Sequence, residues 1–402
     1  MSGSALDDIC VVDLSQGVPG GYCTKLLTDF GAQVIKVEPV HGEATRHVGP
    51  FPAGPPGAER GALPLYLNGG KKSITLEIQS ATGRQLLCQL VQRADVLVES
   101  FLPGALAGLG LDYPALQKLN SRLVMCSITY FGQVGPYRDF LGSDLIALAL
   151  SSYLDLTGDP DKPPLRTGGS QAEYQAGLNA AIAIMSALSY RDDAGVGQYL
   201  DVSAIEAVLS TYDGTALLTM EERTGHAPKR RGTRLQHRDP HAAYPSTLLP
   251  CKDGWVHAHW SPSNPEGLAF LTGNPRLADP EVMDELMGHA DEIDELLAAW
   301  LKDHTRDEVM ALAQEVRVPF TKVQSIDEVL EDPQNQATGF FVPVEHPEAG
   351  TLRYPGSPMH MPASTCRTAR APLLGEHTEE VLCNLLELGA DDVLRLRAEG
   401  SI

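Results

Sequence analysis

One short stretch combines two glycines with two adjacent lysines, a pattern that can bind an anion. It reads Gly69-Gly70-Lys71-Lys72-Ser73. Such a turn allows backbone amides and ammonium groups to converge on one phosphate. Arg46, in Gly42-Glu43-Ala44-Thr45-Arg46, is a second candidate of this kind. For both stretches a solvated turn is the alternative interpretation.

Other common catalytic signatures do not occur in the sequence. The stretch Gly17-Val18-Pro19-Gly20-Gly21 does not match GxGxxG, so it predicts a tight turn rather than a nicotinamide site. No GxSxG elbow of a serine hydrolase is found. The 12 histidines show no HExxH and no other metal-ligand spacing. We therefore expect no metal and no permanently bound cofactor.

Composition narrows the range of partners. The chain has 402 residues, more than one hydrophobic core usually supports, so two domains are expected. Its 31 Lys and Arg residues against 52 Asp and Glu residues give a formal net charge of -21. This charge repels polyphosphates at long range and argues against nucleic acid and anionic membranes as partners. An anionic ligand must be held by local positive charge or backbone amides.

The cysteines and the N-terminus indicate a compartment. Seven scattered cysteines form no CxxC pair, as expected of reduced thiols in the cytosol. The N-terminus lacks the basic and apolar regions of a signal peptide. No apolar segment approaches the roughly 20 residues of a membrane span. We expect a soluble cytoplasmic protein.

Strand-like and helix-like segments alternate through the first half of the chain. The predicted strands are Ile9–Leu14, Gln33–Glu38, Asp95–Ser100 and Leu123–Ile128, and the predicted helices between them are Tyr22–Asp29 and Ala81–Arg93. This alternation predicts an α/β fold with a parallel sheet. Ligands of such sheets bind at the carboxyl ends of the strands. The loops after Leu14, Glu38, Ser100 and Ile128 are therefore candidate site loops.

The second half of the chain indicates a separate, smaller unit. A long Ala-rich helix is predicted from Glu173 to Tyr190, and a hairpin around Cys251 to Trp255. Basic residues with glycine and proline follow Glu222 and suggest a domain crossing. We predict a large domain over residues 1–225, a small α+β domain over 226–326, and a return to the large domain over 327–402.

Several ordered segments together resemble the family III CoA-transferases, which include formyl-CoA transferase and the carnitine and bile-acid CoA-transferases. The matching segments are Val12–Ser15, Phe30–Pro39, Asn68–Ser73, Ala94–Gly104, Gly195–Gln198 and Arg370–Thr378. No single segment is decisive, but the ordered set spans nearly the whole chain.

The resemblance implies a Rossmann-like large domain and a smaller domain in a ring-like subunit that interlocks with a second subunit. It also implies a coenzyme A (CoA) thioester as substrate, bound at the strand ends of the large domain. The residues that it places there are Gln16, Gly17, Val18, Pro39, Gly70, Lys71, Lys72, Ser73, Ser100, Phe101 and Leu102. The resemblance therefore favours the phosphate-binding interpretation of Lys71 and Lys72.

The catalytic residue of the family is an aspartate near the start of a helix, and the matching residue here is Glu173. The resemblance implies that its carboxylate attacks the acyl-CoA thioester, forms a mixed anhydride and then carries CoA as a thioester. A glutamate is longer by one methylene, and errors of about 1 Å can cost on the order of a hundredfold in rate. Glu173 is thus either a nucleophile in an adjusted pocket or the relic of a silent subunit.

Further departures from the family pattern keep that second interpretation open. Pro39 and Gly108 stand where well-known members have arginines that hold CoA, and Ser100 where they have an asparagine. The glycine-rich lid of formyl-CoA transferase has no counterpart. Partners are therefore an acyl-CoA, a carboxylate acceptor, and either an identical subunit or a paralogous one that carries the active carboxylate.

A third interpretation comes from acyl-CoA racemases, which belong to the same family. They carry a Gly-His-Asp motif, and this chain has Gly142-Ser143-Asp144. A serine hydroxyl is too weak a base to abstract a proton next to a thioester unaided. Asp144 is instead predicted to cap the helix through Ala149, with a substrate contact by Asp144 or Arg46 as the functional alternative.

Overall fold

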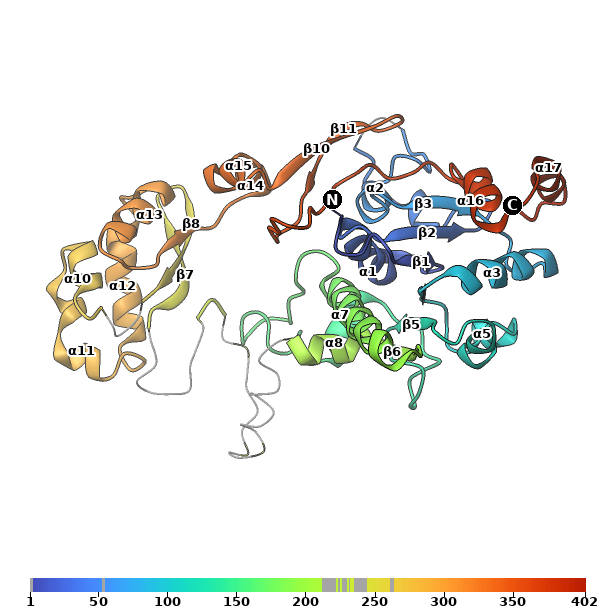
Figure 1. The fold of residues 1–402 in the computed structure, drawn as a ribbon. Helices are drawn as coiled ribbons and strands as arrows, with labels where there is room; N and C mark the ends of the chain where they lie inside the picture. Colours follow the sequence, from blue (N-terminus) through green and yellow to red (C-terminus); the bar gives the residue numbers. More distant parts are fainter. Residues whose placement is uncertain are drawn as a thin grey trace. The chain divides into compact units, whose positions relative to one another are not determined.

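The computed structural model describes residues 3–52, 55–211, 222, 225, 230, 232–234, 244–260 and 264–402. These residues form two compact units, which are described separately (Figure 1). Unit 1 lies within residues 1–153, 167–223 and 334–402, and unit 2 within 154–166 and 224–333. The segment 154–166 of unit 2 was not foreseen, and the predicted boundaries at 226 and 327 stay predictions.

Unit 1 is built on a six-stranded parallel sheet with the order β3-β2-β1-β4-β5-β6. The strands are β1 (Cys10–Asp13), β2 (Gln33–Glu38), β3 (Lys72–Thr75), β4 (Val96–Glu99), β5 (Val124–Thr129) and β6 (Tyr199–Ser203). Val12 lies opposite Ile35 on one side and Leu97 on the other. The predicted α/β class and parallel sheet are confirmed.

Helices cover both faces of this sheet, which explains its nearly continuous apolar strands. The helices among the described residues of unit 1 are α1 (Gly17–Asp29), α2 (Ala62–Leu67), α3 (Ala81–Arg93), α4 (Ala105–Gly108), α5 (Tyr113–Leu119), α6 (Asp144–Leu150), α7 (Gln171–Ala194), α8 (Ala204–Thr211), α15 (Pro333–Thr338, which starts at the unit boundary), α16 (Thr378–Leu386) and α17 (Ala390–Ala398). A short 3-10 helix, η1 (Ala44–His47), and a hairpin of β10 (Phe341–His346) and β11 (Gly350–Pro355) complete it.

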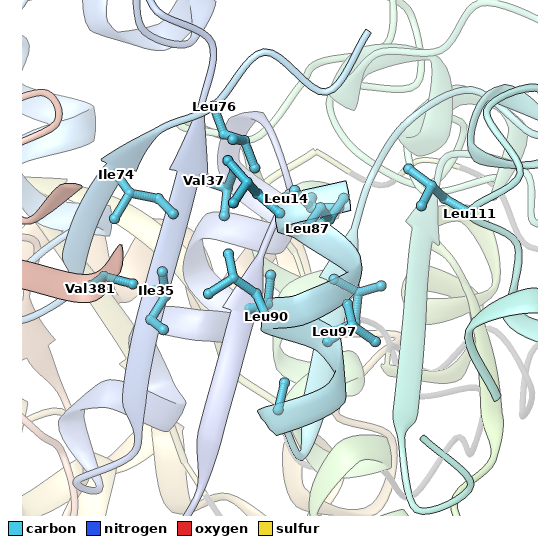
Figure 2. Packing of buried hydrophobic residues seen from close by; sticks show 14 of the residues in the cluster. Leu14, Ile35, Val37, Ile74, Leu76, Leu87, Leu90, Leu97, Leu111 and Val381 are labelled. Carbon is cyan, nitrogen blue, oxygen red and sulfur yellow. The ribbon is translucent and has the colours of Figure 1, made fainter. Parts of the chain in front are cut away.

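The main core of unit 1 joins segments far apart in the sequence. Figure 2 shows Ile35, Val37 and Ile74 of the sheet packed with leucines of α3 and with Val381 of α16. The return of the chain after unit 2 thus completes the core of the first 150 residues. On the other face α1 packs closely on α7, where a Cβ on Gly177 would lie only 2.4 Å from the carbonyl oxygen of Pro19.

One helix start differs from the prediction in a way that matters for the site. The helix predicted from Tyr22 begins at Gly17. Gly17 has a φ of +76°, and Pro19 lies in the first turn, where a missing N–H costs nothing. The start of α1 therefore lies directly at the carboxyl end of β1.

Unit 2 holds a three-stranded antiparallel sheet with the order β7-β8-β9. Its strands are β7 (Ser246–Cys251), β8 (Gly254–His259) and β9 (Thr321–Lys322), so the predicted hairpin is present. Its helices are α10 (Gly267–Thr272), η2 (Pro275–Ala278), α11 (Pro280–Asp284), α12 (Ala290–Leu301), α13 (Arg306–Glu315) and α14 (Ile326–Glu331). The domain crossing predicted after Glu222 lies mostly outside the described residues. In the part of the chain that is described, no helix has both the length and the apolar character to cross a membrane.

Candidate active site

The N-terminus of α7 is capped from outside its own sequence. Its N-cap Ser170 makes no side-chain capping bond. Instead Asp144 Oδ1 accepts the backbone N–H of Ala172 at 2.8 Å and that of Glu173 at 3.3 Å. Asp144 thus binds donors that a helix N-terminus leaves free and fixes the backbone of Glu173.

The predicted capping role of Asp144 on its own helix was wrong. The N-cap of α6 is Ser143, whose Oγ accepts the N–H of Ile146 at 3.4 Å. Asp144 occupies the first turn of α6, one position later. Its carboxylate is therefore directed to α7, a contact between residues 28 positions apart that local pattern does not reveal.

The Glu173 carboxylate is half-buried and hydrogen-bonded. The hydroxyl of Tyr130, which follows β5, donates to Glu173 Oε1. Burial raises the pKa of Glu173, and the negative charge of Asp144 acts in the same direction. The hydrogen bonds from Tyr130 and Ser170 oppose this increase, because they stabilise the ionised form. The net result is a carboxylate more basic than one in water.

Glu173 opens into a cavity of about 360 Å³, called here the Glu173 cavity. It is lined by Gln16, Gly17, Pro19, Ser100, Phe101, Leu102, Pro103, Ile128, Thr129, Tyr130, Phe131, Arg138, Phe140, Leu141, Gly142, Glu173 and Ala204. Six of the predicted site residues are therefore brought together: Gln16, Gly17, Ser100, Phe101, Leu102 and Glu173. The cavity lies at the carboxyl ends of β1, β4 and β5, where a parallel sheet places its ligands.

Ser100 ties two of the site loops together. Its Oγ accepts the backbone N–H of Gln16 at 2.8 Å and donates to the Gln16 carbonyl oxygen at 3.0 Å. Next to it, the N–H of Phe101 donates to Glu99 at 2.7 Å. The loop after β1 and the loop after β4 thus form one wall of the cavity.

Pro39 lies in a neighbouring cavity of about 240 Å³, called here the Pro39 cavity. Gln16 and Phe101 line both cavities, so the two adjoin. The Pro39 cavity also contains Glu38, Glu43 and Glu77 in its wall and no Lys or Arg among its lining residues. Val18 is buried in α1 and lines neither cavity.

The glycine-lysine turn does not line these two cavities. Gly70 is exposed with a φ of +78°, and its N–H donates to the Arg370 carbonyl oxygen. Lys72 is half-buried and forms an ion pair with Glu380 at 2.8 Å. Ser73 is buried, where its hydroxyl donates to Glu38 at 2.9 Å and accepts the N–H of Gly375 at 3.0 Å.

The prediction that Lys71 binds a CoA phosphate is not supported by its position. Its side chain is 0% exposed, and Nζ lies 3.0 Å from Asp13 Oδ2. Nζ also contacts Thr24 Oγ1 at 2.7 Å and Asn68 Oδ1 at 3.1 Å. An ammonium group has three donors, so these protein acceptors satisfy Lys71. It is a structural residue that holds β1 against the turn before β3.

Arg46 is also a structural residue. Its guanidinium donates from Nε and Nη2 to the two carboxylate oxygens of Glu38, at 2.7 and 2.8 Å, and from Nη1 to Glu59 at 2.8 Å. The side chain is 3% exposed and lines neither cavity. The alternative of a substrate contact by Arg46 therefore has no support.

The sequence analysis identified the loop after Ile128 as a candidate site loop but did not name three of its residues that line the cavity. Tyr130, Phe131 and Arg138 all line the Glu173 cavity and follow β5. The only signal in the sequence was the position of this loop after a predicted strand. No group of three or more His, Cys, Asp or Glu side chains arranged like metal ligands was found among the described residues.

Comparison with known families identifies the chain. The model of CoA-transferase family III matches residues 6–378. The chain belongs to CoA-transferase family III. The resemblance drawn from the sequence is thereby confirmed.

Similar proteins in this family match over almost the whole chain. The chain is 34% identical to a succinyl-CoA–D-citramalate CoA-transferase of Chloroflexus aurantiacus, over 98% of this chain and 97% of that protein. It is 32% identical to a succinate–glutarate CoA-transferase of Agrobacterium fabrum, over 94% and 95% of the two chains. The crystal structure of a CaiB/BaiF family protein from Brucella suis has a TM-score of 0.84 and 31% identity, over 95% of this chain and 100% of that one.

Proposed function

We propose that this chain transfers CoA from an acyl-CoA thioester to a carboxylic acid, with Glu173 as the nucleophile. The observation that carries the proposal is the position of Glu173 in one cavity with five other residues expected at a CoA site. Membership of CoA-transferase family III and the names of the relatives support the same reaction class.

The reaction needs no oxidant and no net proton. The Glu173 carboxylate attacks the acyl carbonyl carbon, the carbon–sulfur bond breaks, and CoA thiolate leaves a mixed anhydride behind. The thiolate attacks the Glu173 carbonyl carbon, which releases the donor acid and forms a glutamyl-CoA thioester. An acceptor carboxylate then attacks the carbonyl carbon of this thioester. The carbon–sulfur bond breaks, CoA thiolate leaves, and a second mixed anhydride joins Glu173 to the acceptor. Attack of the thiolate on the acceptor carbonyl yields the new acyl-CoA and regenerates Glu173.

The surroundings of Glu173 suit this role. Asp144 fixes its backbone, and Tyr130 holds one carboxylate oxygen in place. Positioning of this kind converts binding energy into rate. The mostly apolar wall around the carboxylate limits hydration and strengthens electrostatic interactions there. We further expect an interlocked dimer in the cytoplasm.

The test is to trap the intermediate on the purified full-length chain. The chain is incubated with succinyl-CoA or acetyl-CoA, quenched with hydroxylamine or borohydride, and digested for mass spectrometry. A hydroxamate or an alcohol at Glu173 is the expected result. The Glu173→Gln variant should show no adduct, and its rate should fall by about a thousandfold or more.

The same experiment distinguishes an active transferase from a catalytically silent subunit. An absence of adduct with every acyl-CoA, together with labelling of a copurified paralogue, would overturn the proposal and assign this chain to the inactive half of a heterodimer. Exchange of the proton next to the thioester without any adduct would instead indicate a racemase.

A further inference from the structure

The Glu173 cavity contains a cation that the proposed reaction does not use. Among its lining residues, all of which are described, Arg138 is the one Lys or Arg. The adjoining Pro39 cavity has none among its lining residues. In a chain with a net charge of -21, a lone cation in the wall of the cavity that also contains Glu173 marks the place where an anionic group of the substrate can bind.

The guanidinium of Arg138 is accessible and only weakly engaged. Its side chain is 46% exposed, and its Nε lies 3.1 Å from Oδ1 of the adjacent Asp139, which is itself 72% exposed. An exposed pair of this kind is weak, because water screens both charges. The contact uses Nε, whereas a guanidinium has four further N–H donors that suit a carboxylate.

The loop that carries Arg138 is held in place. At its start the N–H of Gly132 donates to Thr129 Oγ1 and the N–H of Gln133 to Asp201, both at 2.9 Å. Around Arg138 the rings of Phe131, Tyr137 and Phe140 pack together, with centroid distances between 5.0 and 6.3 Å. Arg138 is therefore presented by an ordered aromatic cluster.

The rest of the cavity wall suits a short carbon chain. Leu102, Ile128 and Phe131 are apolar and line the same space as Glu173 and Arg138. A volume of about 360 Å³ accommodates a small acyl group with part of the thiol arm. A ligand complementary to this lining has an apolar middle, one carboxyl carbon at Glu173 and a second anionic group at Arg138.

We propose that Arg138 binds the second carboxylate of a short dicarboxylic acyl substrate and so selects dicarboxylic over monocarboxylic acids of equal length. This inference rests on the proposed function, because the first carboxyl carbon must react with Glu173. It names Arg138 as the specificity-determining residue of the site.

The experiment compares succinyl-CoA with butyryl-CoA, which share a four-carbon acyl chain. The KM and kcat for adduct formation at Glu173 are measured for the full-length protein and for Arg138→Ala, Arg138→Lys and Arg122→Ala. Arg122 is a matched control, since it is 51% exposed, contacts Asp192 at 3.9 Å and does not line the cavity. Thermal unfolding verifies that each variant is folded.

We expect Arg138→Ala to raise the KM for succinyl-CoA by about 10- to 100-fold, the range for a lost hydrogen bond to a charged group. The KM for butyryl-CoA should change by less than about twofold, and Arg138→Lys should restore part of the preference. Equal increases for both substrates would assign Arg138 to a phosphate of CoA and overturn the inference. An unchanged KM for both would overturn it as well.

A binding measurement keeps this test separate from the proposed function. Calorimetric titration with succinate and with butyrate measures the preference without chemistry. Tighter binding of succinate that is lost in Arg138→Ala supports the inference even where no Glu173 adduct forms, which would contradict only the proposed reaction. An adduct at Glu173 without any preference for succinate would contradict only the role of Arg138.

Discussion

Two carboxylates of unit 1, Asp13 and Glu173, lie in opposite electrostatic settings. Asp13, at the end of β1, is 0% exposed, with Lys71 Nζ at 3.0 Å and Lys36 Nζ at 3.8 Å. Glu173 is half-buried in a cavity wall and has a tyrosine hydroxyl as its side-chain partner. Asp13 is paired within the fold, whereas the Glu173 carboxylate faces a cavity.

The difference shows in the pKa values of the two carboxyl groups. Burial alone would raise the pKa of Asp13, but Lys36 and Lys71 lower it to about 2. Burial also raises the pKa of Glu173, and no Lys or Arg is among the groups that lower it. A lysine that the sequence places at a ligand site can therefore pair with a buried carboxylate instead, because buried charges must be paired.

The largest expected effect on stability comes from Asp13→Asn. The change leaves the buried ammonium groups of Lys36 and Lys71 without their shared carboxylate, at a cost of about 3–5 kcal/mol in the free energy of unfolding. Urea denaturation measures it. Asp192→Asn, at a position 71% exposed, is the control and should cost less than about 0.5 kcal/mol. A loss below 1 kcal/mol for Asp13→Asn would show that the lysines find other partners.

Asp13 also predicts an acid-sensitive component of stability. Its pKa is lowered in the folded state, so its contribution is full above the ordinary value of 3.8 and is lost as the pH falls toward about 2. The contribution amounts to about 2 kcal/mol. The difference in unfolding free energy between the wild-type protein and Asp13→Asn, measured from pH 5 to pH 2, should therefore shrink by about 2 kcal/mol. Parallel curves would contradict the assignment.

Asp144→Ala should affect both stability and rate. The change removes the acceptor for the N–H groups of Ala172 and Glu173, which costs about 1–2 kcal/mol as for other lost caps. A misplaced Glu173 should lower kcat by about 10- to 100-fold. Ser80→Ala is the matched control, because Ser80 caps α3 by accepting the N–H of Gly83 at 2.9 Å. It should cost similar stability and leave kcat unchanged, and equal losses of rate in both variants would exclude a positioning role for Asp144.

Tyr130→Phe tests the electrostatics of Glu173. The hydroxyl lowers the pKa of Glu173, so its removal should raise that pKa further. Only ionised Glu173 is nucleophilic, so the acid limb of kcat/KM should move to higher pH by the same amount. Tyr190→Phe, at a tyrosine 57% exposed on α7, serves as the control. A shift to lower pH would contradict the direction of the hydrogen bond.

Lys72→Ala should have the smallest effect. Its ion pair with Glu380 is partly exposed and contributes less than about 1 kcal/mol to stability. The sequence-based expectation that Lys72 lies near a CoA phosphate predicts CoA binding weaker by about threefold to tenfold. Isothermal titration with CoA measures this, and an unchanged Kd would remove the last lysine of this turn from the site.

Local sequence patterns predicted the bounds of elements in unit 1 where a run of buried residues or a capping residue marks those bounds. Gln33–Glu38 and Ala81–Arg93 have the predicted bounds, since the first is a β-branched buried run and the second begins after the cap Ser80. The start of α1 was missed because a glycine and a proline are also typical of turns. The N-cap of α6 is Ser143 and not the predicted Asp144. The two differ by one position, which only the backbone geometry resolves.

The sequence by itself determined the alternation of strands and helices, the family and the position of Glu173, because these depend on patterns of neighbouring or ordered residues. The tertiary structure decided which charged side chains are paired inside the fold and which line the cavity. Lys71 is satisfied by Asp13, which is 58 positions away, and Tyr130 reaches Glu173 across 43 positions. The desolvation and pairing of a charge depend on such distant neighbours, so Lys71 became part of the core and Arg138 remained available in the cavity.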